Sequence, residues 1–389
     1  MYQPQIIIVG AGIVGLSTAY ALLDQGMKNV TVLEQAAVDH DKGTSHGTSR
    51  LLRFEYGSNK AYSQMVQLSL NLWRQLEVHT NRTFYTRTGI LALGNLSDQE
   101  TEASYHILKD LGLPMTLLNS QEHLMRFPQF NKSDFDYITY NPEAGILNAS
   151  AILKTLKTLI RDRGGIIGEA TRVIQLKYGK QHEKVSLVLE NNDSINADHV
   201  VVATGPWVHR LLADLQLPVR LSRQYLLYFD GLPMPGYEIN NFPAFVANDL
   251  YGFPVHKSSS GKLWLKAASH SFGPTIDPDD PPTLDAQAIG KIQNRLQNLI
   301  PALHTSKLAH VEAWMYDVSP DEDFILDHVP DDPRVIFATG LTGHGFKFGL
   351  LLGKLLSSLV LNTPPPISME RFHLKRFSRI LAHVSRSVA

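Results

Sequence analysis

The stretch IIIVGAGIVG at residues 6–15 constrains the fold more than any other part of this chain. Residues 5–9 predict a short buried strand, and residues 16–25 predict the helix that follows it. Residues 29–33 predict a second strand, which ends at Glu34. Strand, helix and strand in this order indicate the βαβ unit of a parallel sheet.

Three glycines in this stretch have the G-x-G-x-x-G spacing of a dinucleotide-binding turn. Gly10 allows a tight turn, Gly12 lets the backbone approach a pyrophosphate, and Gly15 lets the helix pack on the strand. Glu34 lies 24 positions after Gly10, near the roughly 20 typical of the acid that binds a ribose. The free N–H groups at the helix N-terminus also favour phosphate. The alternative is an ordinary strand–turn–helix connection built from small residues.

Two later segments repeat the pattern of a β-branched strand, Ala-Thr-Gly and a helix. They lie at residues 197–212 and 333–356. We expect both strands to join the same parallel sheet, with Gly205 and Gly340 at the carboxyl edge where ligands bind. Ala-Thr-Gly is also common turn chemistry, which is the alternative interpretation. The nucleotide domain is therefore predicted to be assembled from distant pieces of sequence.

The segments between these pieces predict a second domain of antiparallel sheet with helices. Helices are expected at 97–112 and 120–128, and strands at 223–230, 244–254 and 262–269. Residues 285–303 predict an amphipathic helix with one apolar face, formed by Ile289, Ile292, Leu296, Leu299 and Ile300. The predicted class is thus α/β with an α+β second domain. The first, Rossmann-like domain takes 1–85, 148–215 and 320–389, and the second, a substrate domain on an antiparallel or mixed sheet, takes 86–147 and 216–319.

Composition excludes several kinds of protein. The chain has 36 Lys and Arg against 37 Asp and Glu, without a long run of one sign, so we expect no nucleic-acid partner. It has no cysteine, which excludes disulfides, thiolate catalysis and zinc–cysteine sites. Polar residues and glycines interrupt the apolar run 6–23, and two lysines interrupt 346–361, so we expect a cytoplasmic protein without a membrane anchor.

Two acidic segments, 271–286 and 317–333, invite interpretation as metal sites. Neither has the calcium-loop spacing, and prolines interrupt both. We therefore expect solvated loops and no metal.

The distribution of glycine-rich turns favours FAD over a nicotinamide cofactor. A nicotinamide enzyme usually has one contiguous nucleotide-binding half. Here the first turn is N-terminal, the matching strands return after residues 197 and 333, and GLTGHGFKFG at 340–349 opens the final helix. This distribution suits a longer cofactor that spans two domains.

Eight segments then carry a resemblance over nearly the whole chain. They are GTSHGTSRLLRFEYG (43–57), TGILALG (88–94), PEAGILNAS (142–150), ATGPWVHRLL (203–212), YGFP (251–254), LKAASH (265–270), SPDEDFILD (319–327) and GLTGHGFKFG (340–349). In this order the chain resembles the monomeric sarcosine oxidase and N-methyltryptophan oxidase family, within the D-amino acid oxidase superfamily of FAD-dependent oxidoreductases.

The resemblance implies a site for the substrate carboxylate. Arg53 and Lys347 match the residues that hold it, and two cations suit a carboxylate, for which Arg adds bidentate geometry. The alternative for Arg53 is a structural ion pair with Glu55 or another acid. The alternative for Lys347 is a side chain that extends to solvent, although a cation in the first turn of a helix is unfavourable without a nearby anion.

The resemblance also implies residues around the flavin ring. Lys266 matches the lysine that activates O2, and its alternative is an outward-facing strand residue. His270 and Tyr251 match positions that line the substrate cavity, whereas His46 and Arg50 match residues that flank the flavin. For each of these four the alternative is a hydrogen-bonded interior residue. The full set expected to contact the cofactor is Gly10, Gly12, Ile13, Val14, Gly15, Glu34, Gln35, Ser45, His46, Arg50, Val173, Thr204, Gly205, Trp207, Trp314, Gly340, Gly343, His344, Gly345, Phe346 and Lys347.

The chain differs from the family in having no cysteine. In the relatives a cysteine thioether links the flavin covalently, and the matching position here is Trp314. No cysteine exists anywhere in the chain, so we expect FAD to be bound noncovalently. Trp314 would bring a large ring to the flavin edge, where it would stack or narrow the pocket. The alternative is that it fills core volume.

The implied reaction is oxidation of secondary or N-methylated amino acids. A hydride equivalent would pass to flavin N5, water would hydrolyse the imine, and O2 would reoxidise the flavin and give H2O2. Two alternatives stay open: an FAD-dependent dehydrogenase of D-amino acids, imino acids or hydroxy acids, and a flavin-binding protein without catalysis. The expected partners are a small amine or amino acid with a carboxylate and O2, and the resemblance favours a monomer.

Overall fold

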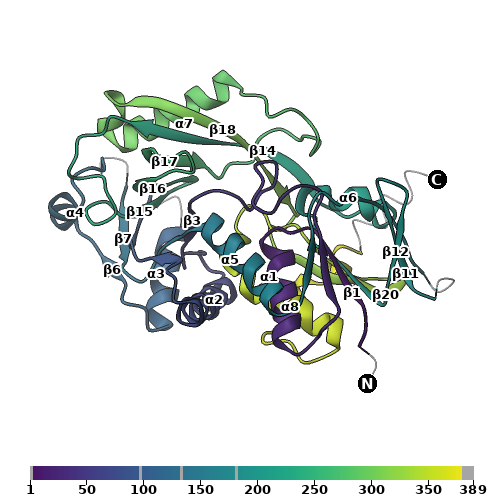
Figure 1. Ribbon diagram of the computed structural model, residues 1–389. Coiled ribbons are helices and arrows are strands. Elements are labelled where there is room, and N and C mark those ends of the chain that lie inside the picture. The colour runs from purple at the N-terminus through teal and green to yellow at the C-terminus, as the bar shows by residue number, and fades with distance from the viewer. Residues whose placement is uncertain (1–2, 96–98, 132–134, 180–182, 379–389) are drawn as a thin grey trace.

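The computed structural model describes residues 3–95, 99–131, 135–179 and 183–378 of the 389-residue chain. Two large sheets organise the molecule (Figure 1). The α/β class with a second mixed sheet, as expected from the sequence, is confirmed.

The first large sheet has six strands, and its centre is the N-terminal strand. Their order is β19 (Ile325–Val329), β20 (Asp332–Thr339), β13 (His199–Val202), β1 (Ile6–Val9), β2 (Val30–Leu33) and β9 (Ile166–Gly168). Five of these strands are parallel, and only β19 runs antiparallel. The β-branched residues of β1 are buried, as expected of a strand covered on both faces. The predicted return of distant strands to one parallel sheet is therefore confirmed.

Helices cover one face of this sheet and a small sheet covers the other. On one face Ile6 and Ile8 pack against α1 (Ile13–Asp24), α5 (Ala149–Asp162) and α8 (Gly349–Leu361). On the other face Ile7 and Val9 pack against the strands of the small sheet: β10 (Val173–Lys177), β11 (Val185–Leu189) and β12 (Ser194–Ala197). Helix α1 begins three residues earlier than predicted, directly after the glycine turn.

The second large sheet has eight strands and is mostly antiparallel. Their order is β18 (Lys307–Val318), β14 (Arg220–Asp230), β17 (Leu263–Ser269), β16 (Leu250–Lys257), β15 (Ala244–Ala247), β5 (Ile90–Gly94), β7 (Tyr137–Asn141) and β6 (Thr116–Leu117). Only β15 and β5 pair in parallel. Helix α7 (Ala286–Leu299) covers one face with the predicted apolar stripe, and Asp285 caps its N-terminus.

Smaller elements connect the two sheets. The strands β3 (Arg50–Leu52), β8 (Gly145–Leu147) and β4 (Tyr85–Thr86) form a third small sheet. The long helix α2 (Lys60–Thr80) packs against α8, and α4 (Ser120–Arg126) matches a predicted helix. The helix predicted at 97–112 is α3 (Gln99–Asp110), and its expected start at 97–98 lies outside the described residues.

Two local predictions were wrong. The single strand expected at 244–254 is the hairpin of β15 and β16, because Asn248 adopts a positive φ of 53° and reverses the chain. The acidic segment 317–333 is not a solvated loop, because it contains β19 and its carboxylates pair with arginines. The segment 271–286 is mostly exposed, as expected.

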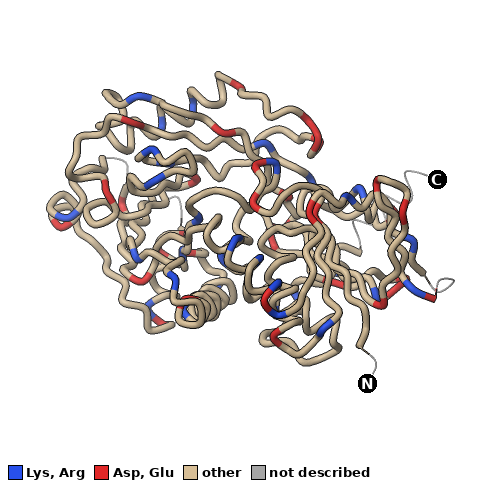
Figure 2. Tube along the Cα trace, in the orientation of Figure 1, with Lys and Arg blue, Asp and Glu red and all other residues tan. Residues whose placement is uncertain are grey.

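Charged residues of both signs are spread along the described part of the chain. Figure 2 shows Lys and Arg interspersed with Asp and Glu over the traced chain. Within the described ranges, each helix is too short or too polar to cross a lipid bilayer. In the same ranges, no group of three or more His, Asp or Glu side chains is arranged to hold a metal ion.

Candidate functional site

A large cavity is lined by residues of both large sheets. Its volume is about 1410 Å³, above the roughly 300–1,000 Å³ of a pocket for one small ligand. The cavity therefore has room for a dinucleotide together with a substrate. It brings together all the predicted site residues except Gly15 and Gly340.

The glycine turn at one end of the cavity requires residues without a side chain. Gly10 has a φ of +104°, and a Cβ there would lie 2.4 Å from the carbonyl oxygen of Ala203. A Cβ at Gly15 would lie 1.8 Å from the carbonyl oxygen of Gly10. Gly15 thus allows α1 to pack on β1, which explains why it lies outside the cavity wall.

Glu34 presents a charged acceptor at the same end. Its carboxylate accepts the N–H of Ala11 at 2.8 Å and of Ala36 at 3.0 Å, and lies 3.4 Å from Nε2 of His40. Burial alone would raise the pKa of Glu34, but the hydrogen bonds from His40 and the two backbone N–H groups hold it below the usual value. An ionised carboxylate is suited to accept hydrogen bonds from ribose hydroxyls.

Further polar groups line the end of the cavity that contains the glycine turn and Glu34. The buried Oγ1 of Thr204 has no hydrogen-bond partner among the described residues, although buried hydroxyls are normally paired. Ser45 accepts the N–H of Ile13 at 3.0 Å, and Trp207 donates to Asp279 at 2.9 Å. Other predicted residues on this wall are Gly12, Val14, Gln35, Val173 and Gly205. An unpaired hydroxyl, a glycine cradle and an ionised carboxylate fit a dinucleotide such as FAD.

A stack of cationic and aromatic groups lies farther along the cavity. The rings of His46 and Trp314 are stacked, with centroids 4.7 Å apart. The guanidinium of Arg50 lies 4.4 Å from the Trp314 centroid and donates to the carbonyl oxygens of Thr44 and His46 at 3.0 and 2.6 Å. Because these donors are used by backbone carbonyls, Arg50 holds the 44–50 loop in place beside Trp314.

Lys266 lies inside the cavity and does not face outward. Its Nζ is buried, 3.3 Å from the carbonyl oxygen and 3.4 Å from Oγ of Ser49. Burial, and to a smaller extent the nearby Arg50, lowers the pKa of Lys266 to about 7. The group can therefore change its charge near neutral pH, which is unusual for lysine.

Arg53 and Lys347 meet on the ring of Tyr56. The guanidinium of Arg53 lies 4.5 Å from the ring centroid and Nζ of Lys347 lies 5.2 Å from it. Lys347 is 4% exposed, so it does not extend to solvent, and it donates to the Tyr56 hydroxyl at 2.8 Å. Among the described residues, no carboxylate pairs with either cation within 4.0 Å.

Arg53 and the Glu55 carboxylate do not form the ion pair that was the alternative interpretation of Arg53. Arg53 donates to the backbone carbonyl of Glu55, whereas the Glu55 carboxylate accepts from Asn141 at 3.1 Å and from the N–H of Phe54 at 2.9 Å. Burial raises the pKa of Glu55. Burial, and next the positive charge of Arg53, lowers the pKa of Lys347 well below its ordinary value. A half-buried and a buried cation on the same aromatic ring favour an anionic ligand.

Tyr251 and His270 line the wall between these groups. The hydroxyls of Tyr251 and Tyr316 lie 3.2 Å apart, and the His270 ring is 5.5 Å from that of Tyr316. Burial, and next the nearby Arg53, lowers the pKa of His270 to about 4, so its ring is neutral at pH 7. The remaining predicted residues on the cavity wall are Gly343, His344, Gly345 and Phe346.

Three of the wall residues that sequence reasoning missed contact the predicted site residues: Tyr56, Tyr316 and Ser49. Tyr316 lies two residues after Trp314 on β18, and period-two alternation would have placed both on one face. Tyr56 lies three residues after Arg53 within a segment that the resemblance had already identified. Ser49 gave no comparable signal.

Comparisons with known proteins agree with this geometry. Residues 5–359 match the DAO family, described as FAD dependent oxidoreductase. The chain is similar to the N-methyl-L-tryptophan oxidase of Yersinia pestis (strain Pestoides F), with 30% identity over 96% of this chain and 99% of that protein. It is also similar to the peroxisomal sarcosine oxidase of Homo sapiens, with 29% identity over 95% of each.

Solved structures share the fold. The glycine oxidase of Geobacillus kaustophilus superposes with a TM-score of 0.79 over 97% of this chain and 99% of that one, at 19% identity. The L-proline dehydrogenase of P. horikoshii gives a TM-score of 0.81 over 97% and 98%, at 20% identity. The family match over most of the chain, together with a cavity that fits a dinucleotide, shows that this protein belongs to the DAO family of FAD-dependent oxidoreductases.

Proposed function

We propose that this protein is an oxidase of secondary or N-methylated amino acids that uses noncovalently bound FAD and O2. The overall reaction oxidises the C–N bond of the substrate to an imine, which water hydrolyses, while O2 is reduced to H2O2. The observation that carries the proposal is that the half-buried Arg53 and the buried Lys347 both lie on the ring of Tyr56. An amino acid substrate brings the carboxylate that this pair lacks among the described residues.

The protein side chains would bind and orient the substrate. Arg53 and Lys347 hold its carboxylate, while Tyr251 and His270 exclude water from the amine end. His270 is a weak base at pH 7 because burial lowers its pKa to about 4. We therefore propose that the substrate reacts as the unprotonated amine, without a protein base that removes a C–H proton.

FAD, when bound, supplies the two-electron redox chemistry for which no side chain of this protein is suited. The residues that would hold it extend from Gly10 and Glu34 at one end to Arg50 and Trp314 at the other. Lys266 would place positive charge where negative charge develops on O2 as it is reduced. The absence of cysteine supports noncovalent binding.

The domain assignment belongs to the same proposal. All strands of the six-stranded sheet fall within 1–85, 148–215 and 320–389, which we assign to the FAD-binding domain. All strands of the eight-stranded sheet fall within 86–147 and 216–319, which we assign to the substrate domain.

Production of H2O2 by the FAD-loaded protein tests the proposal. Each N-methyl amino acid is compared with its primary amino acid and with the N-methyl amine that lacks the carboxylate. We expect peroxide from at least one N-methyl amino acid, less from its primary counterpart, and the least from the carboxylate-free amine. Flavin reduction without peroxide would favour the dehydrogenase alternative, and no reduction by any amine would favour a noncatalytic flavin protein.

A further inference from the structure

The two cations of the carboxylate site are held by a directed chain of hydrogen bonds. Lysine has only donors, so Nζ of Lys347 donates to the Tyr56 oxygen at 2.8 Å. The Tyr56 hydroxyl proton is then free to point at Nδ1 of His344, 3.1 Å away. In that tautomer Nε2 of His344 carries the proton and donates to the carbonyl oxygen of Glu322 at 3.3 Å. The orientation of Lys347 therefore depends on where the Glu322 carbonyl lies.

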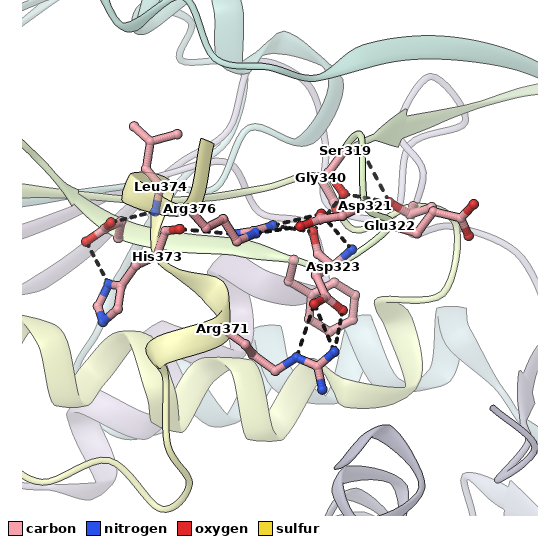
Figure 3. Close-up of polar contacts among 12 residues, drawn as sticks. Ser319, Asp321, Glu322, Asp323, Gly340, Arg371, His373, Leu374 and Arg376 are labelled. Atoms are coloured by element: carbon pink, nitrogen blue, oxygen red, sulfur yellow. Dashed lines mark hydrogen bonds and ion pairs between the residues drawn. The ribbon is translucent and has the colours of Figure 1, made fainter. Parts of the chain in front are cut away.

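The loop that carries Glu322 needs support from outside. Glu322 has a φ of +62°, which is costly for a residue with a side chain. The segment 319–323 lines the cavity from Pro320 to Asp323. The C-terminal segment 370–377 supplies the support through two arginines, as Figure 3 shows. We name Arg371 and Arg376 the C-terminal clamp.

The clamp holds the loop at two of its three acidic residues, Asp321 and Asp323. Arg371 donates to both carboxylate oxygens of Asp323, at 2.8 to 3.1 Å. Arg376 donates to the Asp321 carboxylate at 2.8 Å and to the backbone carbonyl of Asp323 at 2.9 Å (Figure 3). Bidentate pairs of this kind fix geometry more tightly than a single contact.

Arg371 also reaches the other side of the carboxylate site. Its remaining nitrogen donates to Oδ1 of Asn59 at 3.0 Å, three residues after Tyr56. Its guanidinium lies 5.0 Å from the ring centroid of Tyr62, which stacks on Tyr56 at 5.0 Å. One side chain thus fixes the two segments that contain Tyr56 and Glu322 relative to each other.

We propose that Arg371 is a positioning residue for the substrate carboxylate: it holds both ends of the Tyr56–His344–Glu322 chain and so orients Lys347. Arg371 does not itself line the cavity. This inference rests on the proposed function, because it assumes that Arg53 and Lys347 bind a carboxylate.

The test compares carboxylates with their uncharged amides on the FAD-loaded protein. Acetate, propionate and benzoate are titrated against acetamide, propionamide and benzamide by calorimetry. The variants are Arg371→Met and Tyr56→Phe. The matched control is Arg334→Met, which removes another arginine that binds an aspartate, Asp332, but lies outside the cavity wall. A role in stability alone would change melting temperature without changing the preference for carboxylates.

We expect Tyr56→Phe to weaken carboxylate binding about 10-fold, since hydrogen bonds to charged groups are the stronger ones. Arg371→Met should weaken it about 3- to 10-fold, while amide binding and the control stay as in the original protein. Tyr56→Phe removes only the hydroxyl and keeps the aromatic ring. It therefore tests the hydrogen-bond chain Tyr56–His344–Glu322 even if Arg371→Met does not fold. If the original protein prefers carboxylates and a folded Arg371→Met keeps that preference, or Tyr56→Phe keeps it, the inference is wrong. If the original protein shows no preference, the proposed function fails first.

Discussion

The guanidinium carbon of Arg50 lies 4.4 Å from the centroid of the Trp314 ring, at the position where the resemblance implies a flavin-linking cysteine. The indole is fixed further because Nε1 donates to Glu312 at 3.1 Å, and the same carboxylate oxygen accepts the Tyr228 hydroxyl at 2.8 Å. Trp314 is thus an ordered part of the cavity wall, held by stacking, a cation and a hydrogen bond.

This arrangement predicts that acid releases all of the flavin. Precipitation of the FAD-loaded protein should leave the yellow colour in the supernatant, because the chain has no cysteine to form a thioether. The measurement is flavin absorbance in pellet and supernatant. Colour in the pellet would mean a covalent bond to another residue.

Trp314→Cys should allow a covalent bond to the flavin if Trp314 occupies the position of the flavin-linking cysteine in the relatives. A fraction of the flavin should then stay with the precipitated protein. Ala313→Cys is the matched control, since Ala313 lies next to Trp314 but packs on the opposite face of the sheet. Equal labelling of both variants would contradict the match.

Lys266 predicts a selective defect in the reaction with O2. Below pH 7, where Lys266 carries its proton, Lys266→Met should slow the return of flavin colour in air by about 10²- to 10³-fold, since it removes a preorganised charge. Bleaching by substrate without oxygen should change far less. Stopped-flow absorbance separates the two rates, and equal slowing of both would argue that Lys266 acts on the substrate.

The buried Lys266 also predicts a pH dependence of stability. Between pH 7 and 10.5 the unfolded chain keeps the lysine protonated, whereas the folded protein holds it neutral, because burial lowers its pKa to about 7 from 10.5. The unfolded state therefore binds more protons, and stability rises with pH across this window.

Relative to Lys266→Met, the free energy of unfolding of the original protein should rise from pH 7 to pH 10, by at most about 1.4 kcal/mol per pH unit. Below pH 7 the difference should be constant. Chemical denaturation of both proteins at equal flavin loading measures it. A difference that does not vary between pH 7 and 10 would mean that Lys266 stays charged in the folded state.

Much of the fold could be predicted because its signals are local. The β-branched run of β1, the glycine turn and the acid at Glu34 gave the βαβ unit, and the apolar stripe gave α7. The hairpin at Asn248 was missed because a non-glycine residue makes the turn, and no local pattern marked it. The clamp of Asp323 by Arg371 joins residues 48 positions apart, so only the folded chain brings them together.

The candidate site could likewise be predicted only in part. Arg53, Lys266 and Lys347 came from the resemblance, whereas nothing in the sequence indicated that Tyr56 would contact two of them. That contact depends on α2, whose Trp73 donates to the carbonyl oxygen of Lys347 at 2.7 Å and so holds against it the 3-10 turn Phe346–Phe348 that precedes α8. Such packing between distant elements cannot be read from periodicity.

Loss of the Lys347 charge should weaken the use of carboxylate substrates. Lys347→Met is expected to lower kcat/KM about 100-fold, because a charge-assisted hydrogen bond to the substrate is lost. Lys354→Met is the matched control, since this lysine is exposed on α8 outside the cavity wall. Steady-state kinetics with an active N-methyl amino acid measures the effect, and equal behaviour of the two variants would contradict the assignment.

Anaerobic titration of the FAD-loaded protein with N-methyl amino acids and their carboxamides tests the central claim most directly. The site proposed at Arg53 and Lys347 predicts that at least one N-methyl amino acid bleaches the flavin band, that its carboxamide does so far more slowly, and that air restores the band. Equal bleaching by acid and amide, or no bleaching by any N-methyl amino acid, would contradict it.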